Sequence, residues 1–287
     1  MTTNKRTLIG LQADLFRHPL DLQATNTLKQ LPGIDIAIRS VLGSVAEQFF
    51  YLNNIASSVL VSEKQLPHLH KLLIEACEIL ELEQTQLYEQ QKPTPNAYTY
   101  DMRREKPFVV LHTSLIEMLT PEEIQAVIAH ELGHLKCEHG VYLTMANVLV
   151  LAANLLPAWG TVLAQSLQDR MLQWVRCAEF SCDRAALLAS QDPRVVMSVL
   201  MKLAGGSPTL APLLNLDAFI EQASAYDSVG TDSMGEMLQA AQTAQLSHPV
   251  PVIRAREIAR WASSSEYQAI MDKQQLNSSN KLGWSNW

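Results

Sequence analysis

No part of the sequence interleaves a dense block of lysine and arginine with aromatic residues, and the formal net charge is −7 with a pI near 5.6. Nucleic-acid binding is therefore disfavoured. The segment from Met1 to Phe16 contains neither a continuous apolar run nor a small-residue cleavage site. This absence predicts that there is no secretory signal and that the protein is cytoplasmic.

The sequence is also poor in cysteine, and its four cysteines include no C-x-x-C pair. With no export signal, this favours reduced thiols in a cytosol-like compartment. Three of the cysteines lie close to the motifs described below, and buried, unreactive thiols are a simpler interpretation of them than redox regulation. These are Cys137, Cys177 and Cys182.

Hydrophobic residues make up 47% of the 287 positions, which is ample for a folded core. We expect a helical N-terminal extension (residues 1–62), a main domain (63–272) and a disordered polar tail (273–287). In the extension, Asp21 can cap a short helix that ends near Leu31, and Ile34–Ile55 predicts a longer apolar helix. We expect this extension to pack on the main domain, although its pairing with a membrane or a partner is an alternative.

The main domain begins with an amphipathic helix from Leu66, followed by three short extended runs at Thr85–Gln91, Ala97–Tyr100 and Phe108–His112. Prolines and a charged turn separate these runs, so they predict a small antiparallel sheet. With helices before and after it, this sheet gives a mostly helical α+β fold. His112 at the end of the last strand is interpreted as a packing residue or a partner of a site residue, not as a ligand.

A helix is predicted from Thr120 to Gly140. Thr120 is a good N-cap, Pro121 suits the first helical position, and Glu123 completes a capping box. Within the helix, His130 and His134 lie one turn apart and project from the same side. Together with Glu131 they form an H-E-x-x-H motif, in which the histidines can bind Zn²⁺ and the glutamate can take a proton from water. A surface helix with two incidental histidines is the alternative.

The third ligand decides between these interpretations. A histidine ten residues after the first is excluded because that position is Gly140, and Cys137 occupies the position where that class requires a glycine. Farther along the chain, Glu179 and Asp183 lie four residues apart on a helix whose apolar neighbours indicate burial. One carboxylate can complete a His₂Glu zinc site, and the other can accept the free N–H of a ligating histidine. An ordinary acidic helix face is the alternative.

Four spaced segments resemble the HtpX-like family of zinc metallopeptidases, which includes the CaaX prenyl endopeptidases, over about residues 65–262. They are the Asn96-Ala97-Tyr98 strand, the HELGH motif, the R-x-x-E-x-x-x-D pattern of Arg176, Glu179 and Asp183, and His248-Pro249 with Arg254. Cys182 stands where the family usually has alanine before the aspartate. Arg256 is close enough to compete with Arg254 for its role.

This resemblance implies a zincin-like metallopeptidase domain with one zinc ion per chain. It assigns Glu179 as the third ligand beside His130 and His134, and Asp183, Arg254 and Arg176 as supporting residues. It places His248 at the active site, where we expect it to stabilise the oxyanion. The expected activity is hydrolysis of protein or peptide substrates with Glu131 as general base, and the intact Glu131 argues against a catalytically silent zinc scaffold. A zinc hydrolase acting on a non-peptide substrate is a further alternative.

Residues 140–168 contain no charged side chain, so hydropathy alone makes them a candidate membrane span. His134 and Glu179 lie on either side of this stretch, yet both must reach one metal ion, so the chain would have to cross twice. Two crossings need about 40 residues plus a turn, which is more than the stretch holds. We therefore predict a helical hairpin, divided near Pro157 and Gly160, that does not span a bilayer. It packs on the N-terminal helices or makes a peripheral contact with a membrane, and we prefer a catalytic domain free of the membrane.

Overall fold

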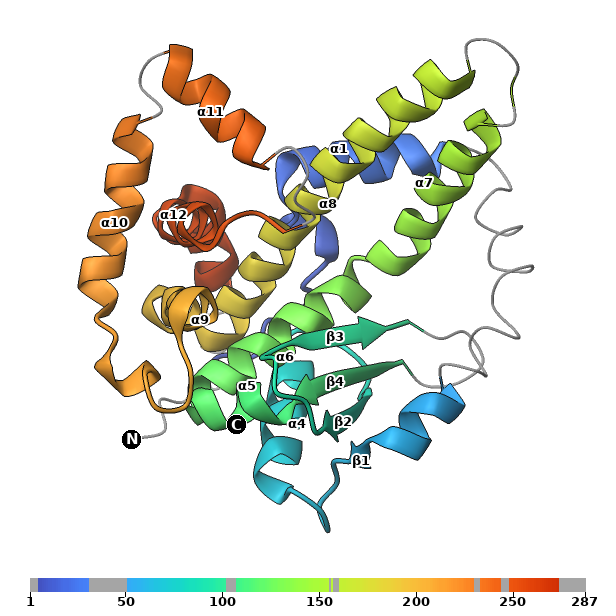
Figure 1. Ribbon diagram of the computed structural model, residues 1–287. Coiled ribbons are helices and arrows are strands. Elements are labelled where there is room, and N and C mark those ends of the chain that lie inside the picture. Colours follow the sequence, from blue (N-terminus) through green and yellow to red (C-terminus); the bar gives the residue numbers. More distant parts are fainter. Residues whose placement is uncertain are drawn as a thin grey trace, which may run out of the picture.

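The computed structural model of the chain describes residues 5–30, 51–101, 107–154, 156, 160–229, 233–243 and 248–273. Helices dominate, and a small sheet lies at one end of the molecule (Figure 1). The mostly helical α+β class is thus confirmed. The strands are β1 (Val59–Leu60), β2 (Gln86–Gln90), β3 (Ala97–Tyr100) and β4 (Phe108–His112). The helices are η1 (Ala13–Leu15), α1 (Pro19–Lys29), α4 (Pro67–Ile79), α5 (Thr113–Met118), α6 (Pro121–Lys136), α7 (His139–Asn154), α8 (Gly160–Ser190), α9 (Pro193–Gly205), η2 (Ala211–Leu213), α10 (Leu216–Val229), α11 (Ser233–Thr243) and α12 (Pro251–Ala262).

The four strands are ordered β1-β2-β4-β3, and the β2–β4 pair is parallel whereas the other two pairs are antiparallel. The sheet is therefore mixed, and the prediction of a wholly antiparallel sheet was wrong. The chain between β2 and β3 does not form a hairpin but carries β3 past the position of β4 to the outer edge. Strands β2 and β3 therefore follow each other in the sequence but are not neighbours in the sheet.

The central strand β4 is buried at every position. Its residues alternate between two faces, as the pleat of a strand requires. Val109 and Leu111 belong to the main core, whereas Phe108 and Val110 pack with Tyr88 on the opposite face. Because both faces are covered, the strand reads as a continuous apolar run.

The N-terminal segment is part of the main core, because Leu8, Leu11 and Phe16 are all buried within it. The short helix predicted in this region forms as α1, but Asp21 is not its cap. The N-cap is His18, whose side chain accepts a hydrogen bond from the backbone N–H of Leu20, and Asp21 lies inside the helix and is fully buried.

Two other predictions for the chain ends lie mostly outside the described residues. Of the helix predicted at Ile34–Ile55, the structure describes only the end, where residues 51–57 are helical. The predicted tail at 273–287 is described only at its first residue. The extension is not wholly helical, because β1 pairs with β2. The domain boundary at residue 62 stays a prediction.

Helix α6 begins as predicted, with a reciprocal capping box between Thr120 and Glu123. The helix ends at Lys136, so the prediction that it continues to Gly140 was wrong. Glu138 adopts a left-handed conformation with φ of 52°, which breaks the helix and allows α7 to begin at His139. Because of this break, His139 does not continue helix α6.

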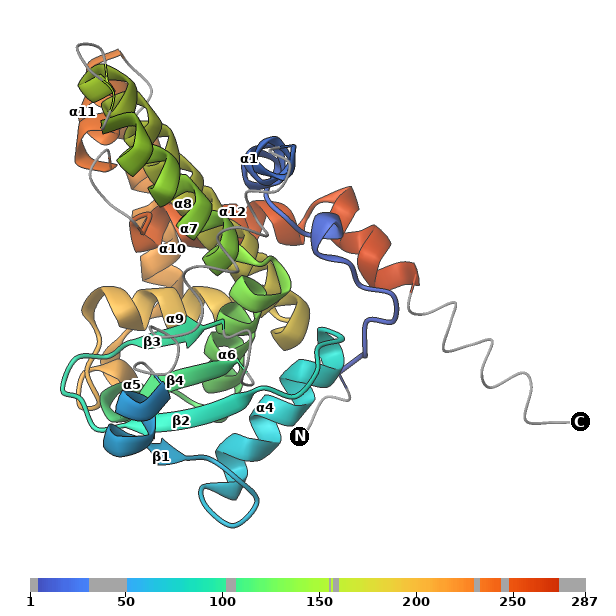
Figure 2. The same cartoon turned by 90° about the vertical axis from the view of Figure 1, so that its right-hand side faces the viewer.

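Helices α7 and α8 lie side by side as a long pair that extends away from the sheet (Figure 2). This is the predicted helical hairpin, and α1 packs against both of its helices. In the described part of the chain, no helix is both long enough and apolar enough to cross a membrane.

Candidate metal centre

Helices α6 and α8 approach each other closely at Gly133, the glycine of the HELGH motif. A Cβ atom at this position would lie 2.9 Å from the Cβ atom of Ala185 and 3.1 Å from the Cα atom of Cys182. Such separations are shorter than van der Waals contact, so a larger side chain here would push the helices apart. Glycine therefore allows the close crossing that brings Glu179 on α8 to the two histidines on α6.

Both histidines of the motif direct Nε2 toward the same carboxylate. His130 Nε2 lies 3.4 Å from Glu179 Oε2, and His134 Nε2 lies 3.5 Å from Glu179 Oε1. Glu179 is buried, and its Oε2 atom accepts no hydrogen bond within the described structure. Two imidazole nitrogens and one carboxylate form a donor set that suits zinc and leaves a fourth position for water. The residues present therefore fit the metal.

The charge of Glu179 also suits a ligand. Burial by itself would raise the pKa of this carboxyl group, but the adjacent rings of His130 and His134 and the charge of Arg254 hold it well below its usual value. Cys182 has its sulfur within 4.8 Å of ring nitrogens of the same two histidines. Burial raises the pKa of this thiol well above its usual value, so it is neutral, and the thiolate is the form that binds metals. The Glu179 carboxylate therefore suits a metal ion better than the Cys182 thiol does.

The other ring nitrogen of His130 is held by a carboxylate and an arginine. His130 Nδ1 lies 3.1 Å from Asp183 Oδ1, and both Nε and one terminal nitrogen of Arg254 donate to Asp183, at 2.8 and 2.6 Å. This geometry distinguishes Arg254 from Arg256, which pairs instead with Glu257. Burial would lower the pKa of His130, but the bonds to Asp183 and Glu179 raise it to about 10.

The other ring nitrogen of His134 has a partner that we did not predict from the sequence. His134 Nδ1 lies 3.0 Å from His139 Nδ1, and His139 Nε2 lies 3.1 Å from Asp21 Oδ2. On a continuous helix, residues five apart point about 140° away from each other, so spacing alone would separate the two histidines. The break at Glu138 brings the rings together, with 5.1 Å between centroids.

The candidate general base also has a partner that the sequence did not reveal. Glu131 is buried beside the histidines, and the Thr99 hydroxyl on β3 donates to Glu131 Oε2 at 2.7 Å. This bond holds one oxygen of the carboxylate in place. The only signal in the sequence was the position of Thr99, in the predicted strand that also carries the Asn96-Ala97-Tyr98 motif.

These residues line a cleft of about 860 Å³ that is bounded on one side by β3. His248 borders the cleft with 66% of its side chain exposed, and its Nε2 lies 3.6 Å from Glu179 Oε1. Among the described residues, Arg254 lines the cleft whereas Arg176 does not. His112 is buried and bonds through Nδ1 to the carbonyl oxygen of Thr94 at 2.8 Å, which is the packing role expected for it.

All four cysteines are buried and unpaired. Burial raises the pKa of Cys137 to about 12 and that of Cys177 to about 11, so neither thiol forms a thiolate at neutral pH. Thiol reactivity depends on the thiolate, which favours the interpretation of these residues as unreactive.

Comparison with known proteins identifies a peptidase family that matches this chain. The model of peptidase family M48 matches residues 63–262. The chain is 55% identical over 263 residues to the plastoglobule-localized metallopeptidase 48, chloroplastic, of Arabidopsis thaliana, covering 92% of this chain and 76% of the relative. It is 29% identical over 189 residues to the protease HtpX homolog 2 of Methanosarcina mazei, covering 56% of this chain and 64% of that relative.

Among solved structures, the chain resembles that of S. mikatae Ste24p at 14% identity with a TM-score of 0.39, covering 83% of this chain and 56% of that one. The part of each curated relative that aligns with this chain is about three quarters of the plastoglobule relative and less than two thirds of the HtpX homolog. The resemblance to HtpX-like metallopeptidases noted from the motifs is confirmed by the family match and by the plastoglobule and HtpX relatives.

Proposed function

The chain belongs to peptidase family M48, and from this premise we propose that it is a zinc-dependent endopeptidase that hydrolyses peptide bonds in protein or peptide substrates. In this proposal His130, His134 and Glu179 hold one zinc ion per chain. The observation that carries it is the convergence of both Nε2 atoms on an ionised, buried carboxylate. The Nδ1 atoms of both histidines already have partners, so the two Nε2 atoms are the ones left to bind a metal ion.

A zinc ion in this site would polarise a substrate carbonyl and acidify water, which is the chemistry that metallopeptidases use. The protein groups supply the proton transfers. Glu131 takes a proton from the attacking water and passes it to the leaving amine, and Thr99 holds its carboxylate in place for both steps. His248, at the rim of the cleft, donates to the oxyanion.

We place the substrate along strand β3. This strand is the last in the sheet order, so its outer edge has no strand partner among the described residues, and it lines the cleft directly beside Glu131. An extended peptide can add to such an edge through backbone hydrogen bonds. Tyr98, whose side chain is exposed on β3, would then contact substrate side chains.

A peripheral lipid contact is a further part of the proposal. Leu156, Val162 and Leu163 are exposed near the end of the α7–α8 pair, within the uncharged stretch 140–168. The plastoglobule location in the name of the Arabidopsis relative supports a lipid surface as the partner. That name also says chloroplastic, and the cytoplasmic location of this chain stays a prediction. Flotation with neutral lipid vesicles tests the contact, and Val162→Asp should then abolish it.

The decisive experiment for the activity is incubation of the purified protein with unfolded casein, with and without a zinc chelator, followed by mass spectrometry of fragments. The matched variant is Glu131→Gln, because it should keep about one zinc per chain while losing cleavage by roughly 10²–10⁴-fold. A catalytically silent scaffold would produce no fragments in either form. Cleavage that persists in Glu131→Gln, or zinc lost from it, would contradict the assigned base.

A further inference from the structure

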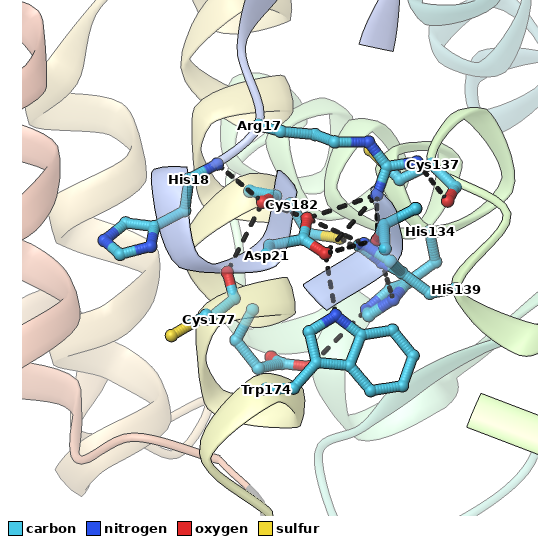
Figure 3. Close-up of polar contacts among 12 residues, drawn as sticks. Arg17, His18, Asp21, His134, Cys137, His139, Trp174, Cys177 and Cys182 are labelled. Atoms are coloured by element: carbon cyan, nitrogen blue, oxygen red, sulfur yellow. Dashed lines mark hydrogen bonds and ion pairs between the residues drawn. The ribbon is translucent and has the colours of Figure 1, made fainter. Parts of the chain in front are cut away.

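The N-terminal segment contributes a buried carboxylate that the proposed mechanism does not use. Asp21 on α1 is fully buried, and its two oxygens are surrounded by hydrogen-bond donors (Figure 3). Trp174 Nε1 donates to Oδ1 at 2.9 Å, and Ser181 Oγ donates to Oδ2 at 2.6 Å. Thr25 Oγ1 donates to Oδ1 at 3.2 Å, and the guanidinium of Arg17 lies 3.3 Å from the same oxygen.

This carboxylate is not suited to a second metal ion. Asp21, Cys137 and His139 have donor atoms within 4.8 Å of one another, which is a spacing that could hold a cation. However, Arg17 already places a positive charge on Asp21, and the Cys137 thiol stays protonated because burial raises its pKa to about 12. A cation here would face a like charge and a poor sulfur ligand.

Asp21 instead reaches the metal centre through one intervening ring. His139 lies between Asp21 and His134, with its Nε2 toward the carboxylate and its Nδ1 toward His134 (Figure 3). His139 is itself buried, and Cys182 Sγ lies 3.6 Å from its Nδ1. The path from Asp21 to His134 is therefore a continuous chain of hydrogen bonds inside the protein.

The direction of each bond follows from what each atom can donate. Burial would raise the pKa of Asp21, but the bonds from His139 and Ser181 and the charge of Arg17 lower it, so the carboxylate is ionised and can only accept. His139 must then carry its proton on Nε2, which leaves Nδ1 as an acceptor. His134 must in turn carry its proton on Nδ1, and its Nε2 is left with a free lone pair toward Glu179.

We propose that Asp21, acting through His139, is a positioning residue of the metal centre that holds His134 in its Nδ1-protonated form with Nε2 directed at the ion. The proposal rests on His134 being a zinc ligand, as argued above. Asp21 lies outside residues 63–262, the part of the chain that matches the family model. The N-terminal segment is therefore part of the site and not only a cover for it.

The test measures zinc affinity by competition with a chromophoric chelator, on the full chain, independently of proteolysis. His139→Leu removes the acceptor and should weaken zinc binding about 10–100-fold, the usual range for a partner of a ligating histidine. His139→Asn places an amide oxygen near the position of Nδ1 and should restore most of the affinity. Asp21→Asn should weaken binding about 10-fold in the natural background.

The non-additivity of these changes separates positioning from general destabilisation. In the His139→Asn background, the added Asp21→Asn substitution should change zinc affinity less than about 2-fold. The hydrogen bond from His139 Nε2 to Asp21 is already absent in that background, so residue 21 no longer acts on His134. Equal effects of Asp21→Asn in both backgrounds would overturn the proposal. If Asp21→Asn does not fold, the comparison of His139→Leu with His139→Asn still decides, since equal affinities of these two would also overturn it.

Glu123→Gln is the matched control for loss of a buried carboxylate. Glu123 lies on α6 like the ligands and is bonded to Ser198 and Lys202, each at 2.6 Å, with no link to His134. The Glu123→Gln substitution should lower the unfolding temperature of the protein without changing its zinc affinity. Glu179→Ala reports on the proposed function itself: if it leaves zinc affinity unchanged, the ligand set is wrong. If it weakens binding and the His139 variants do not, only the positioning proposal fails.

Discussion

The two histidines of the motif lie one turn apart on α6, yet opposite ends of the chain hold them in place. His130 bonds directly to Asp183 on α8, which Arg254 on α12 grips with two hydrogen bonds. His134 bonds to His139, which bonds to Asp21 on α1. The partner of His130 is a carboxylate that is paired with an arginine. The partner of His134 is a neutral imidazole that is bonded to a carboxylate. Similar ligands on one helix can thus be oriented by unrelated parts of a fold.

Both histidines face Glu179 through Nε2, so removal of this carboxylate should have the largest effect on zinc affinity. We expect Glu179→Ala to lower zinc affinity by more than about 100-fold, because a ligand is lost. Asp183→Ala removes only the partner of one ligand and should cost about 10–100-fold. Chelator competition measures both. Equal losses in the two variants, or a greater loss in Asp183→Ala, would reverse the assigned roles.

In the His130 arrangement, Asp183 is paired with Arg254, so removal of this arginine should lower the stability of the protein. Arg254→Met leaves Asp183 and Glu179 buried without their arginine, and should lower the unfolding free energy of the metal-free protein by ~3–5 kcal/mol. Urea unfolding measures this change. The control is Arg194→Met, which breaks the exposed pair with Asp217 and should cost at most about 1 kcal/mol. Similar losses in the two variants would contradict the importance of the buried clamp.

The His130 arrangement should also make zinc binding depend on pH. In the metal-free protein Asp183 and Glu179 raise the pKa of His130 to about 10, so zinc must displace a proton at neutral pH. Zinc affinity should therefore rise about tenfold per pH unit between pH 7 and 9 from this group alone. The stability that the protonated ring gives the metal-free protein is complete below about pH 6.5 and is lost as the pH rises through 10.

Asp183→Ala provides the comparison for this pH dependence. Without Asp183 the pKa of His130 should fall, so zinc affinity should level off at a lower pH than in the natural protein. Titration calorimetry in buffers of different ionisation enthalpy counts the protons released. An unchanged pH profile in Asp183→Ala would show that Asp183 does not hold the His130 proton.

Thr99 touches neither arrangement and should give the smallest effect. Thr99→Val removes the hydrogen bond to Glu131 and should lower kcat about 10-fold with zinc affinity unchanged, which corresponds to the lower end for a bond to a charged group. Thr99→Ser keeps the hydroxyl and should retain activity. Steady-state kinetics with a casein-derived peptide measure both. A loss of zinc in Thr99→Val would mean that the strand positions the ligands as well as the base.

Much of the geometry of the candidate site could be predicted because its proposed ligands lie on two regular helices. The capping box at Thr120 fixes where α6 begins, and a spacing of four residues puts His130 and His134 on one side of it. The same spacing on α8 places Glu179 and Asp183 toward α6. Helical periodicity is a local property, so these relations can be read from the sequence alone. Spacing left the two carboxylate roles interchangeable, and the geometry of the two ring nitrogens favours Glu179 as the ligand.

The sheet shows where local signals were insufficient. Two of the strands were predicted with their observed bounds and the third to within one residue at each end, yet the prediction that the sheet is antiparallel was wrong. Pairing depends on which segments meet in space, and β2 lies beside β4 in a parallel pair instead of beside β3. Asp21 was misinterpreted for a similar reason. Its side chain suits a helix cap, but burial against Trp174 and Ser181 gave it a different set of partners.

The sequence by itself determined which side chains come together locally: two histidines and a candidate general base on one capped helix, and two carboxylates one turn apart on another. These follow from side-chain identity and helical spacing, which act over a few residues. Only the tertiary structure decided what holds each histidine of the motif. The break at Glu138 turns His139 toward His134, and the packing of α1 brings Asp21 to His139 across more than a hundred residues of chain. Such contacts depend on how distant segments pack, and no local pattern records them.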